Sequence, residues 1–154
     1  MIVEGRLWHL QFLVDYGLRP EDVAAIEAFT VYQPNETWVM ESYKHALYKR
    51  VCLGAAGMPV IFTALYPLCP GVLFSWTVGI DKYRQHVREW IPEAKRLFDE
   101  VLAMPMWHRI ECDVLEGFDA AERTIRHFGF EKEGVRRALG RDRRNAIMYA
   151  RIKQ

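Results

Sequence analysis

The spacing of apolar residues along the chain predicts which segments are helical. Val23, Ile26 and Phe29 share one face if residues 19–29 form a helix. Apolar residues recur at the same interval in three later segments, at residues 37–49, 91–104 and 119–128. These four segments are therefore expected to be helices. Pro92 is expected to open the third of them or to kink it, since proline disrupts a helix interior.

Continuous apolar runs and alternating residues predict the strands. Residues 51–56 and 58–65 are expected to form a hairpin, and residues 71–80 are the most strand-like run in the sequence. Three further strands are expected at residues 107–114, 131–139 and 145–152. The last two are expected to pair antiparallel across a basic turn. This order of elements predicts an α/β (α+β) fold built on a mixed sheet.

The helix expected at residues 119–128 carries start and stop signals. Asp119 and Glu122, three residues apart, predict a capping box. Gly129 is expected to adopt the left-handed conformation that ends a helix, and Phe130 can then fold back onto Ile125. The sequence thus predicts a short helix that turns sharply into the first strand of the final pair.

Composition narrows the class of protein. The chain has 154 residues, and 21 Lys plus Arg stand against 20 Asp plus Glu, which gives a net charge of +1. This balance disfavours a dedicated nucleic-acid or membrane-surface binder, because both usually carry a basic excess. No apolar run reaches the roughly 18 residues of a membrane span, and the first residues lack a signal-peptide pattern.

The cysteines indicate a reducing, cytoplasmic setting. Cys52, Cys69 and Cys112 are odd in number, far apart and without C-x-x-C spacing. This spacing disfavours a disulfide framework and a zinc site. Cys112 alternates with charged neighbours in its expected strand, so we interpret it as a small buried apolar residue.

The turn between the last two strands is strongly basic. Its arginines are Arg136, Arg137, Arg141, Arg143 and Arg144. They could contact an anion or RNA, steer an acidic partner, or simply be solvated on a hairpin whose acids offset part of the charge. The overall charge of +1 favours the solvated hairpin.

The stretch HRIECDV…AAERTIRHFGFEKEGVRRALGRDRRNAIMYARI, residues 108–152, resembles the C-terminal half of the GNAT superfamily of acyl-CoA N-acyltransferases. It is most similar to the branch that acetylates ribosomal proteins and small molecules, where a strand, a helix ending in "GF" and an "EG" strand follow in this order. The resemblance implies a single GNAT-like domain over residues 1–154, with a mixed, mostly antiparallel, twisted sheet and helices on both faces.

The first half of the chain has a narrower resemblance. YGLRPEDVAAIEAF, AAGMPVIFTAL and LFSWTVGIDKYRQHVREWIPEAKRLFDEV are similar to segments of small GNAT-like proteins encoded by tailed bacteriophages. Some of those proteins are described as acetyltransferases and others as internal virion proteins. The resemblance thus implies an acetyl-CoA-dependent N-acetyltransferase that works through a direct ternary complex. The alternative is an inactive GNAT fold that serves in binding or assembly, with a protein partner such as a virion component. The acceptor amine stays open.

The resemblance also implies where coenzyme A would lie. The strands at residues 71–79 and 107–114 would splay apart, and backbone groups at Trp76, Thr77 and Val78 would meet the pantetheine arm. The unpaired N–H groups of a helix N-terminus would receive the pyrophosphate.

The segment that matches the family's phosphate loop departs from its motif. The family pattern (Gln/Arg)-x-x-Gly-x-(Gly/Ala) falls on residues 84–89, where Arg84 fits but Val87 and Glu89 stand at the positions of small residues. Basic side chains can compensate by direct contact with phosphate. The candidates are Lys82, Arg84, His86 and Arg88. The alternative is that these four are solvated residues of a loop and a first helical turn.

The proton-transfer residues that the family uses are also altered. The family's tyrosine acid falls on Ile125, so Tyr149 and Tyr83 are the remaining candidate acids. Glu111 and Asp113 are the candidate bases, since both lie on the strand that would flank the acceptor and both face away from Cys112. The alternative interpretation is that both carboxylates face solvent on a half-exposed strand and that Tyr149 is a packed sheet residue.

Overall fold

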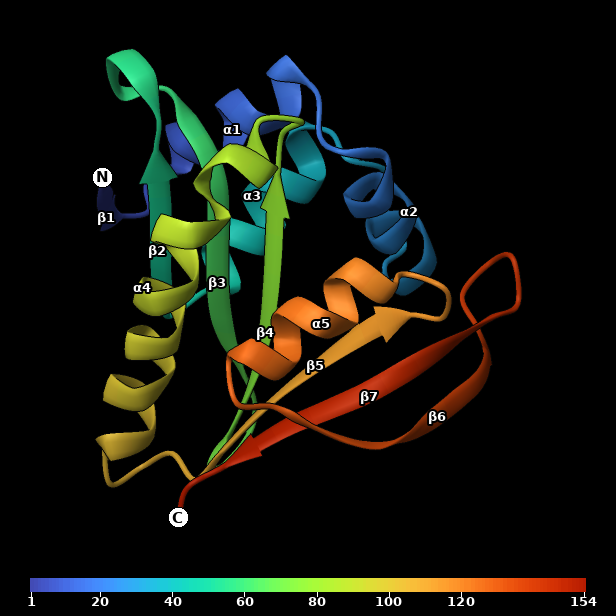
Figure 1. Cartoon of the computed structure of the whole chain (residues 1–154). Coiled ribbons are helices and arrows are strands. Elements are labelled where there is room, and N and C mark those ends of the chain that lie inside the picture. The colour runs from blue at the N-terminus through green and yellow to red at the C-terminus, as the bar shows by residue number, and fades with distance from the viewer.

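A seven-stranded sheet forms the centre of the computed structural model, which describes residues 1–154 (Figure 1). The strands lie in the order β1-β2-β3-β4-β5-β7-β6. Their bounds are β1 (Ile2–Glu4), β2 (Tyr48–Leu53), β3 (Pro59–Cys69), β4 (Val72–Gly79), β5 (Arg109–Leu115), β6 (Glu131–Leu139) and β7 (Arg144–Ile152). Every neighbouring pair is antiparallel except β4 and β5, which run parallel. The predicted α/β fold with a mixed, mostly antiparallel sheet is confirmed.

Helices cover both faces of this sheet. They are α1 (Leu7–Tyr16), α2 (Pro20–Phe29), α3 (Glu36–His45), α4 (Tyr83–Ala103) and α5 (Asp119–His127), with a short 3-10 turn η1 (Ala55–Gly57) between β2 and β3. Figure 1 shows α4 and α5 on the near face and α1 and α3 on the far face. No helix combines the length and the apolarity needed to cross a membrane.

Side chains along β3 and β4 point alternately to the two faces of the sheet, and this alternation decides which helix each side chain contacts. The ring of Trp76 stacks on that of Phe62 with a centroid distance of 5.8 Å and lies 5.5 Å from that of Trp38 on α3. Side chains one residue along point to the opposite face, where Thr63 and Thr77 share a hydrogen bond of 2.7 Å between their hydroxyls. Even-numbered β4 residues therefore face α3, and odd-numbered ones face α4.

The strands and the helix end that local signals predicted near the C-terminus agree with the structure. Strands β6 and β7 pair antiparallel as predicted, and α5 ends where Gly129 takes a φ of 85°. The N–H of Phe130 donates to the carbonyl of Ile125, which is the expected backward contact. The predicted capping box is wrong, because Phe118 is the N-cap residue and its side chain makes no capping bond.

Other details differ from the expected elements. The helix expected over residues 37–49 ends at His45, because Tyr48 and Lys49 belong to β2 and pair with β3. Pro92 does not open α4, which begins at Tyr83 and continues through the proline. Strand β1 and helix α1 were not predicted at all. They lie at the edge of the sheet and on its far face.

Candidate functional site

Strands β4 and β5 separate after a short paired stretch. Their parallel register covers three residue pairs and ends at Phe74 opposite Glu111. Beyond it, residues 75–79 of β4 and 112–115 of β5 have no partner on each other, although β4 stays paired with β3 and β5 with β7. We call the space between these two unpaired segments the wedge.

The wedge is lined by backbone groups that have no strand partner. The N–H of Ile80 donates to β3, so the N–H and C=O groups of odd-numbered residues such as Thr77 point the other way, toward β5. On β5, the N–H of Arg109 donates to the carbonyl of Gly71, so odd-numbered residues such as Asp113 point toward β4. Thr77 and Asp113 therefore direct unpaired backbone groups into the wedge from opposite sides.

The far end of β4 is held by α2. The N–H of Arg19 donates to the carbonyl of Gly79 at 2.9 Å, and the N–H of Gly79 donates to the carboxylate of Asp22 at 2.8 Å. Arg19 binds the buried Asp22 through two hydrogen bonds and lies 3.8 Å from the ring centroid of Tyr83. Burial raises the pKa of Tyr83. This cluster closes the wedge beyond Thr77, so the open backbone of β4 is confined to its middle.

The side chains of the three β4 residues predicted to meet pantetheine do not all face the same way. The indole of Trp76 packs against α3 and the side chain of Val78 is buried, so neither side chain of this pair lies on the α4 face. The Thr77 hydroxyl is bonded to Thr63. What β4 presents to the wedge is thus its main chain, as a peptide-like arm would require.

Helix α4 begins shortly after β4 ends, and the predicted phosphate-binding residues lie on two different flanks of it. We call this end of the wedge its mouth. Arg84, Arg88, Ile91, Lys95 and Phe98 follow one stripe at helical spacing. The ring of Phe98 contacts those of Phe128 and Phe130 at centroid distances of 5.5 and 5.2 Å, so this stripe faces the C-terminal half. The exposed Arg84 and Arg88 therefore lie on the flank toward the wedge.

Lys82 and His86 follow the opposite stripe together with Glu89. His86 Nδ1 lies 3.8 Å from Glu89, and Glu89 binds the Met1 ammonium at 2.6 Å, beside β2. The structure thus brings Arg84 and Arg88 together but separates His86 from them. Val87 lies between the flanks and packs against the hydrophobic core. Val87 and Glu89 both replace the small residues of the family motif, and Glu89 lies on the flank away from the wedge.

The first turn of α4 retains free donors. The amides of Tyr83 and Gln85 donate to the carbonyls of Ile80 and Lys82, whereas the amides of Lys82 and Arg84 have no hydrogen-bond acceptor. The N-cap residue provides no side-chain cap. Free amides and the helix dipole make this turn favourable for an anion.

Glu111 and Asp113 point to the α3 face of the sheet, as expected from alternation. Glu111 accepts from Arg109 Nε at 2.7 Å, and Arg109 also forms an ion pair with Glu133 on β6. The Arg109 guanidinium holds the pKa of Glu133 below its ordinary value. Glu111 is therefore committed to a charge network at the paired end of the strands.

Asp113 lies just beyond the last β4–β5 pair. Its carboxylate is 3.6 Å from Arg136 Nε and makes no side-chain hydrogen bond. Burial raises the pKa of the Asp113 carboxyl above its ordinary value, and the nearby Arg136 opposes this shift. Burial also raises the pKa of Tyr66, and the negative charge of Asp113 adds to this rise. Asp113 is thus a largely buried carboxylate beside the wedge with a pKa shifted toward neutrality.

Tyr149 lies one strand away from the wedge. It pairs with Cys112 in the register of β5 and β7, and its hydroxyl donates to Glu122 of α5 at 2.9 Å. Its burial and the hydrogen bond to Glu122 raise its pKa. The structure does not bring Tyr149 together with Thr77 or Arg84. Cys112 is buried, as predicted, and burial raises the pKa of its thiol.

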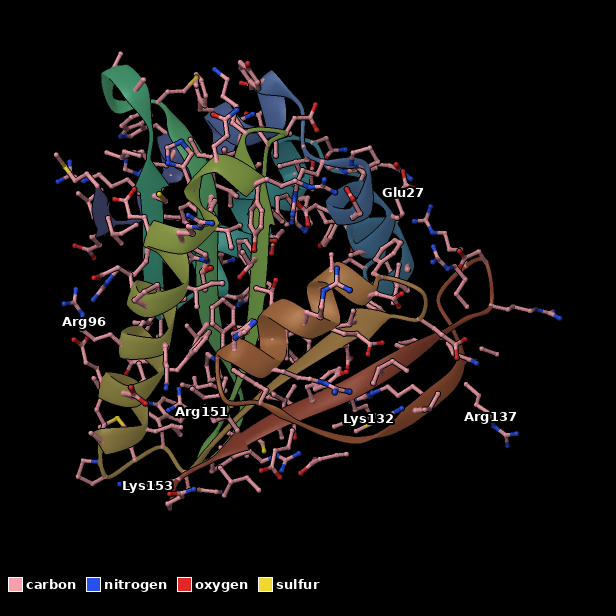
Figure 2. The ribbon with its side chains drawn as sticks, viewed as in Figure 1. Glu27, Arg96, Lys132, Arg137, Arg151 and Lys153 are labelled. Carbon is pink, nitrogen blue, oxygen red and sulfur yellow. The ribbon has the colours of Figure 1, made fainter.

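The arginines of the β6–β7 hairpin have separate surroundings. Arg136 pairs with Asp113, Arg141 donates to the carbonyl of Val31, and Arg144 lies over the Phe118 ring. Figure 2 shows Arg137 pointing from the hairpin away from the rest of the molecule. These side chains therefore do not converge on one point.

Two surface hollows lie away from the wedge. One, of about 290 Å³, is lined by β1 and α1 residues such as Arg6 and Trp8. The other, of about 520 Å³, lies at the opposite end of the sheet, between residues 67–71 and the side chains of Met106 and Trp107.

Solved structures share this fold over the whole chain. A GNAT-family acetyltransferase from Bacillus anthracis matches with a TM-score of 0.73 at 14% identity and covers 99% of this chain and 93% of its own. A GNAT-superfamily phosphinothricin acetyltransferase from Sinorhizobium meliloti, in complex with AcCoA, matches with a TM-score of 0.73 at 11% identity, covering 99% and 88%. A ribosomal-protein-S5-alanine acetyltransferase from Vibrio fischeri gives a TM-score of 0.70 at 10% identity, covering 99% and 92%.

Sequence comparison adds nothing to this likeness, because no family model and no curated protein sequence matches the chain. The structural matches show that the chain has the GNAT fold. Sequence reasoning gave no role in the site to Arg19, Asp22 or Arg109, and it named Arg136 only as part of the basic cluster of the hairpin. The ion pairs of Arg109 with Glu133 and of Arg136 with Asp113 join residues far apart in the chain, so no local sequence pattern predicts them.

Proposed function

We propose that this chain, which has the fold of the GNAT N-acetyltransferases, transfers an acetyl group from acetyl-CoA to an amine. The observation that carries the proposal is the wedge, where Thr77 and Asp113 offer unpaired backbone groups on two diverging parallel strands. A pantetheine arm carries amide groups that can bond to such an edge as an added strand would. Fold likeness alone does not establish a function, so the argument rests on this edge.

The residues present fit acetyl-CoA. Thr77 would bond the pantetheine through its main chain, and the free amides of Lys82 and Arg84 would meet the pyrophosphate at the start of α4. The guanidinium groups of Arg84 and Arg88 would add charge-assisted contacts from the wedge flank. The bound cofactor supplies an activated acetyl thioester.

Asp113 is the residue best placed to act as the base. It lies where the strands part, and burial raises its pKa, which makes the carboxylate a better proton acceptor than an ordinary aspartate. Arg136, 3.6 Å away, opposes this rise by favouring the ionised form. Glu111 is less suited because Arg109 already binds it. The two carboxylates together favour a cationic acceptor. In a ternary complex the deprotonated amine would attack the thioester carbonyl, so that the C–N bond forms and the C–S bond breaks. Coenzyme A would leave as a thiolate and take up the proton that the amine nitrogen gives up.

A second function is a GNAT fold that binds a partner without catalysis. The observation in its favour is that α4 is regular over its first two turns, where Val87 and Glu89 replace the small residues that bring a phosphate loop close to its ligand. The resemblance of the N-terminal half to phage-encoded proteins suggests a virion component as such a partner, and this stays a prediction.

Thermal unfolding with acetyl-CoA tests the first proposal. Ligand at a hundred times its dissociation constant adds about 2.7 kcal/mol, which raises the Tm of a chain of this size by roughly 5–10 °C. Arg84→Ala/Arg88→Ala should reduce that shift, and Lys82→Ala is the matched control on the other flank. An unchanged Tm at millimolar acetyl-CoA would favour the binding protein. A panel of peptide α-amines, amino acids and polyamines then identifies the acceptor class.

A further inference from the structure

One cluster of potential ligand side chains lies on the flank of α4 that the proposed transfer does not use. Cys52 Sγ, an imidazole nitrogen of His86 and a carboxylate oxygen of Glu89 all lie within 4.8 Å of one another. Cysteine spacing in the sequence disfavours a zinc site, but the fold joins Cys52 to residues of a different element. Spacing rules detect only ligands that follow a local motif.

The backbone fixes the relative position of these three residues. Cys52 is fully buried on β2 and pairs with Ile61, which places its side chain on the α4 face. His86 and Glu89 lie one turn apart on α4 and so share one side of the helix. The His86 ring lies directly over Gly54, where a Cβ would be 3.1 Å from Nε2. The Nδ1 atom faces Glu89 at 3.8 Å.

We propose that Cys52, His86 and Glu89 form a zinc site that ties the end of β2 to the first turns of α4. A thiolate, an imidazole and a carboxylate are the three ligand types that zinc takes in proteins, and three protein ligands leave one position for water. The combination of sulfur and nitrogen ligands favours zinc over magnesium or calcium, which bind oxygen.

The present geometry is close to what the metal requires. Bonds of about 2.0–2.3 Å in a tetrahedron put ligand atoms roughly 3.5 Å apart, so atoms that now lie within 4.8 Å must approach by at most about 1.3 Å. Glu89 can supply this movement because its side chain is half exposed. The Met1 ammonium binds the other carboxylate oxygen of Glu89 at 2.6 Å and would compete with the metal for it. The site itself needs only the three side chains.

Zinc at this position would hold the start of α4 on the flank opposite the proposed phosphate site. His86 and Glu89 are on the same helical turns as Arg84 and Arg88 but on the opposite flank. A metal bond to β2 would hold these turns against the sheet. The site and the acetyl-CoA proposal are independent, since either can fail without the other.

Cobalt binding to the full chain tests the site, because thiolate-bound tetrahedral Co²⁺ gives a charge-transfer band and intense visible bands. All proteins carry Cys69→Ser, which removes the exposed thiol, and have no polyhistidine tag. We expect one Co²⁺ per chain with a thiolate band, displacement by Zn²⁺, and a Tm raised by about 5–10 °C at a hundred-fold excess of Zn²⁺ over its dissociation constant.

Three variants assign the ligands. Cys52→Ser should abolish the thiolate band, and His86→Gln and Glu89→Gln should each weaken Zn²⁺ binding at least tenfold. His45→Gln is the control, because His45 lies 3.4 Å from Glu41 on exposed α3 without a cysteine; it should bind as wild type. No thiolate band in the wild type, or unchanged Zn²⁺ affinity in both His86→Gln and Glu89→Gln, would overturn the proposal. These two partly exposed positions decide the test even if Cys52→Ser does not fold.

Discussion

Glu111 and Asp113 lie on the same face of β5, two residues apart, yet their surroundings differ. Glu111 stands at the last β4–β5 pair, bound by Arg109, which also holds Glu133 of β6. Asp113 stands just beyond that pair, beside the wedge, with only Arg136 at 3.6 Å. The β4–β5 boundary is thus closed by backbone pairing at Glu111, where β5 also carries a charge network, and it is open at Asp113.

The closed end also has a neutral network. Trp107 Nε1 donates to the hydroxyl of Tyr48 at 2.9 Å, just before β5 begins. This contact ties the start of β5 to β2, while backbone pairing over three residue pairs holds β4 and β5 together before they part. The comparison teaches that one strand can serve structure at one end and chemistry at the other. Substitutions at the closed end should therefore change stability, and those at the open end should change activity.

The largest effect is expected at the open end. Asp113→Asn should lower kcat/KM for the best acceptor by about 10²–10⁴-fold, the range for loss of a general base. Glu111→Gln should lower it by less than about tenfold, because Glu111 is already bound to Arg109. Steady-state acetylation measures both, with acetyl-CoA affinity as the control that binding is intact. An equal loss of kcat/KM in the two variants would show that Asp113 and Glu111 do not differ in their roles.

The next effect is expected at the closed end. Arg109→Ala should lower the free energy of unfolding by about 2–3 kcal/mol, because it leaves Glu111 and Glu133 near each other without their shared cation. Urea unfolding measures this loss. Arg137→Ala is the control, since Arg137 points into solvent and should change stability by less than about 0.5 kcal/mol. Acetyl-CoA affinity per folded molecule should not change; a tenfold loss would place Arg109 in the site.

A smaller effect is expected at the mouth of the wedge. Replacing Arg84 or Arg88 by Ala should raise the acetyl-CoA dissociation constant by roughly tenfold, the value of one charge-assisted contact. Lys82→Ala should change it by less than about threefold because Lys82 follows the opposite flank of α4. Calorimetric titration measures the three constants. Equal losses at Lys82 and Arg84 would indicate general charge attraction rather than a defined site.

The smallest effects concern pH and have opposite signs at the two ends. Burial raises the pKa of Asp113, so its contribution to stability is full below the unfolded pKa and is lost as pH rises through the folded value. Arg109 lowers the pKa of Glu133, so its contribution is present above the unfolded pKa and is lost as pH falls through the folded value.

Urea unfolding between about pH 3 and pH 7 separates these two signs. As pH rises, Asp113→Asn should gain stability relative to wild type, whereas Glu133→Gln should lose it. The acidic limb of kcat/KM should also lie above the ordinary aspartate range and disappear in Asp113→Asn. Parallel curves for the two variants would show that the carboxylates share one environment.

Local patterns predicted the C-terminal elements because their signals are local. Gly129 stops α5 through its own φ, and the alternation around Cys112 predicted which way Asp113 faces. Helix α1 was missed because most of its residues are apolar, so no polar face marks the helical period, although Leu10 and Leu13 are fully buried. The end of α3 was misplaced because pairing with β3 overrides helix propensity at Tyr48.

The site was less accessible to sequence reasoning. The divergence of β4 and β5 came from the family resemblance, since no residue between them marks where pairing stops. The difference between Glu111 and Asp113 depends on Arg109 and Arg136, and the latter lies on another strand. The basic residues of α4 looked like one group in sequence, but the helix places Arg84 and His86 on different flanks. Such separations exist only once the elements are packed.

Amide hydrogen exchange at the wedge tests the central claim most directly. In the free protein the amides of Thr77 and Asp113 should exchange fast for strand residues, whereas that of Glu111, at the paired end, should exchange slowly. Saturating acetyl-CoA should protect Thr77 at least tenfold and leave Glu111 unchanged. If Thr77 is already protected in the free protein, or stays unprotected with millimolar acetyl-CoA, the wedge does not hold the cofactor and the proposed transfer is contradicted.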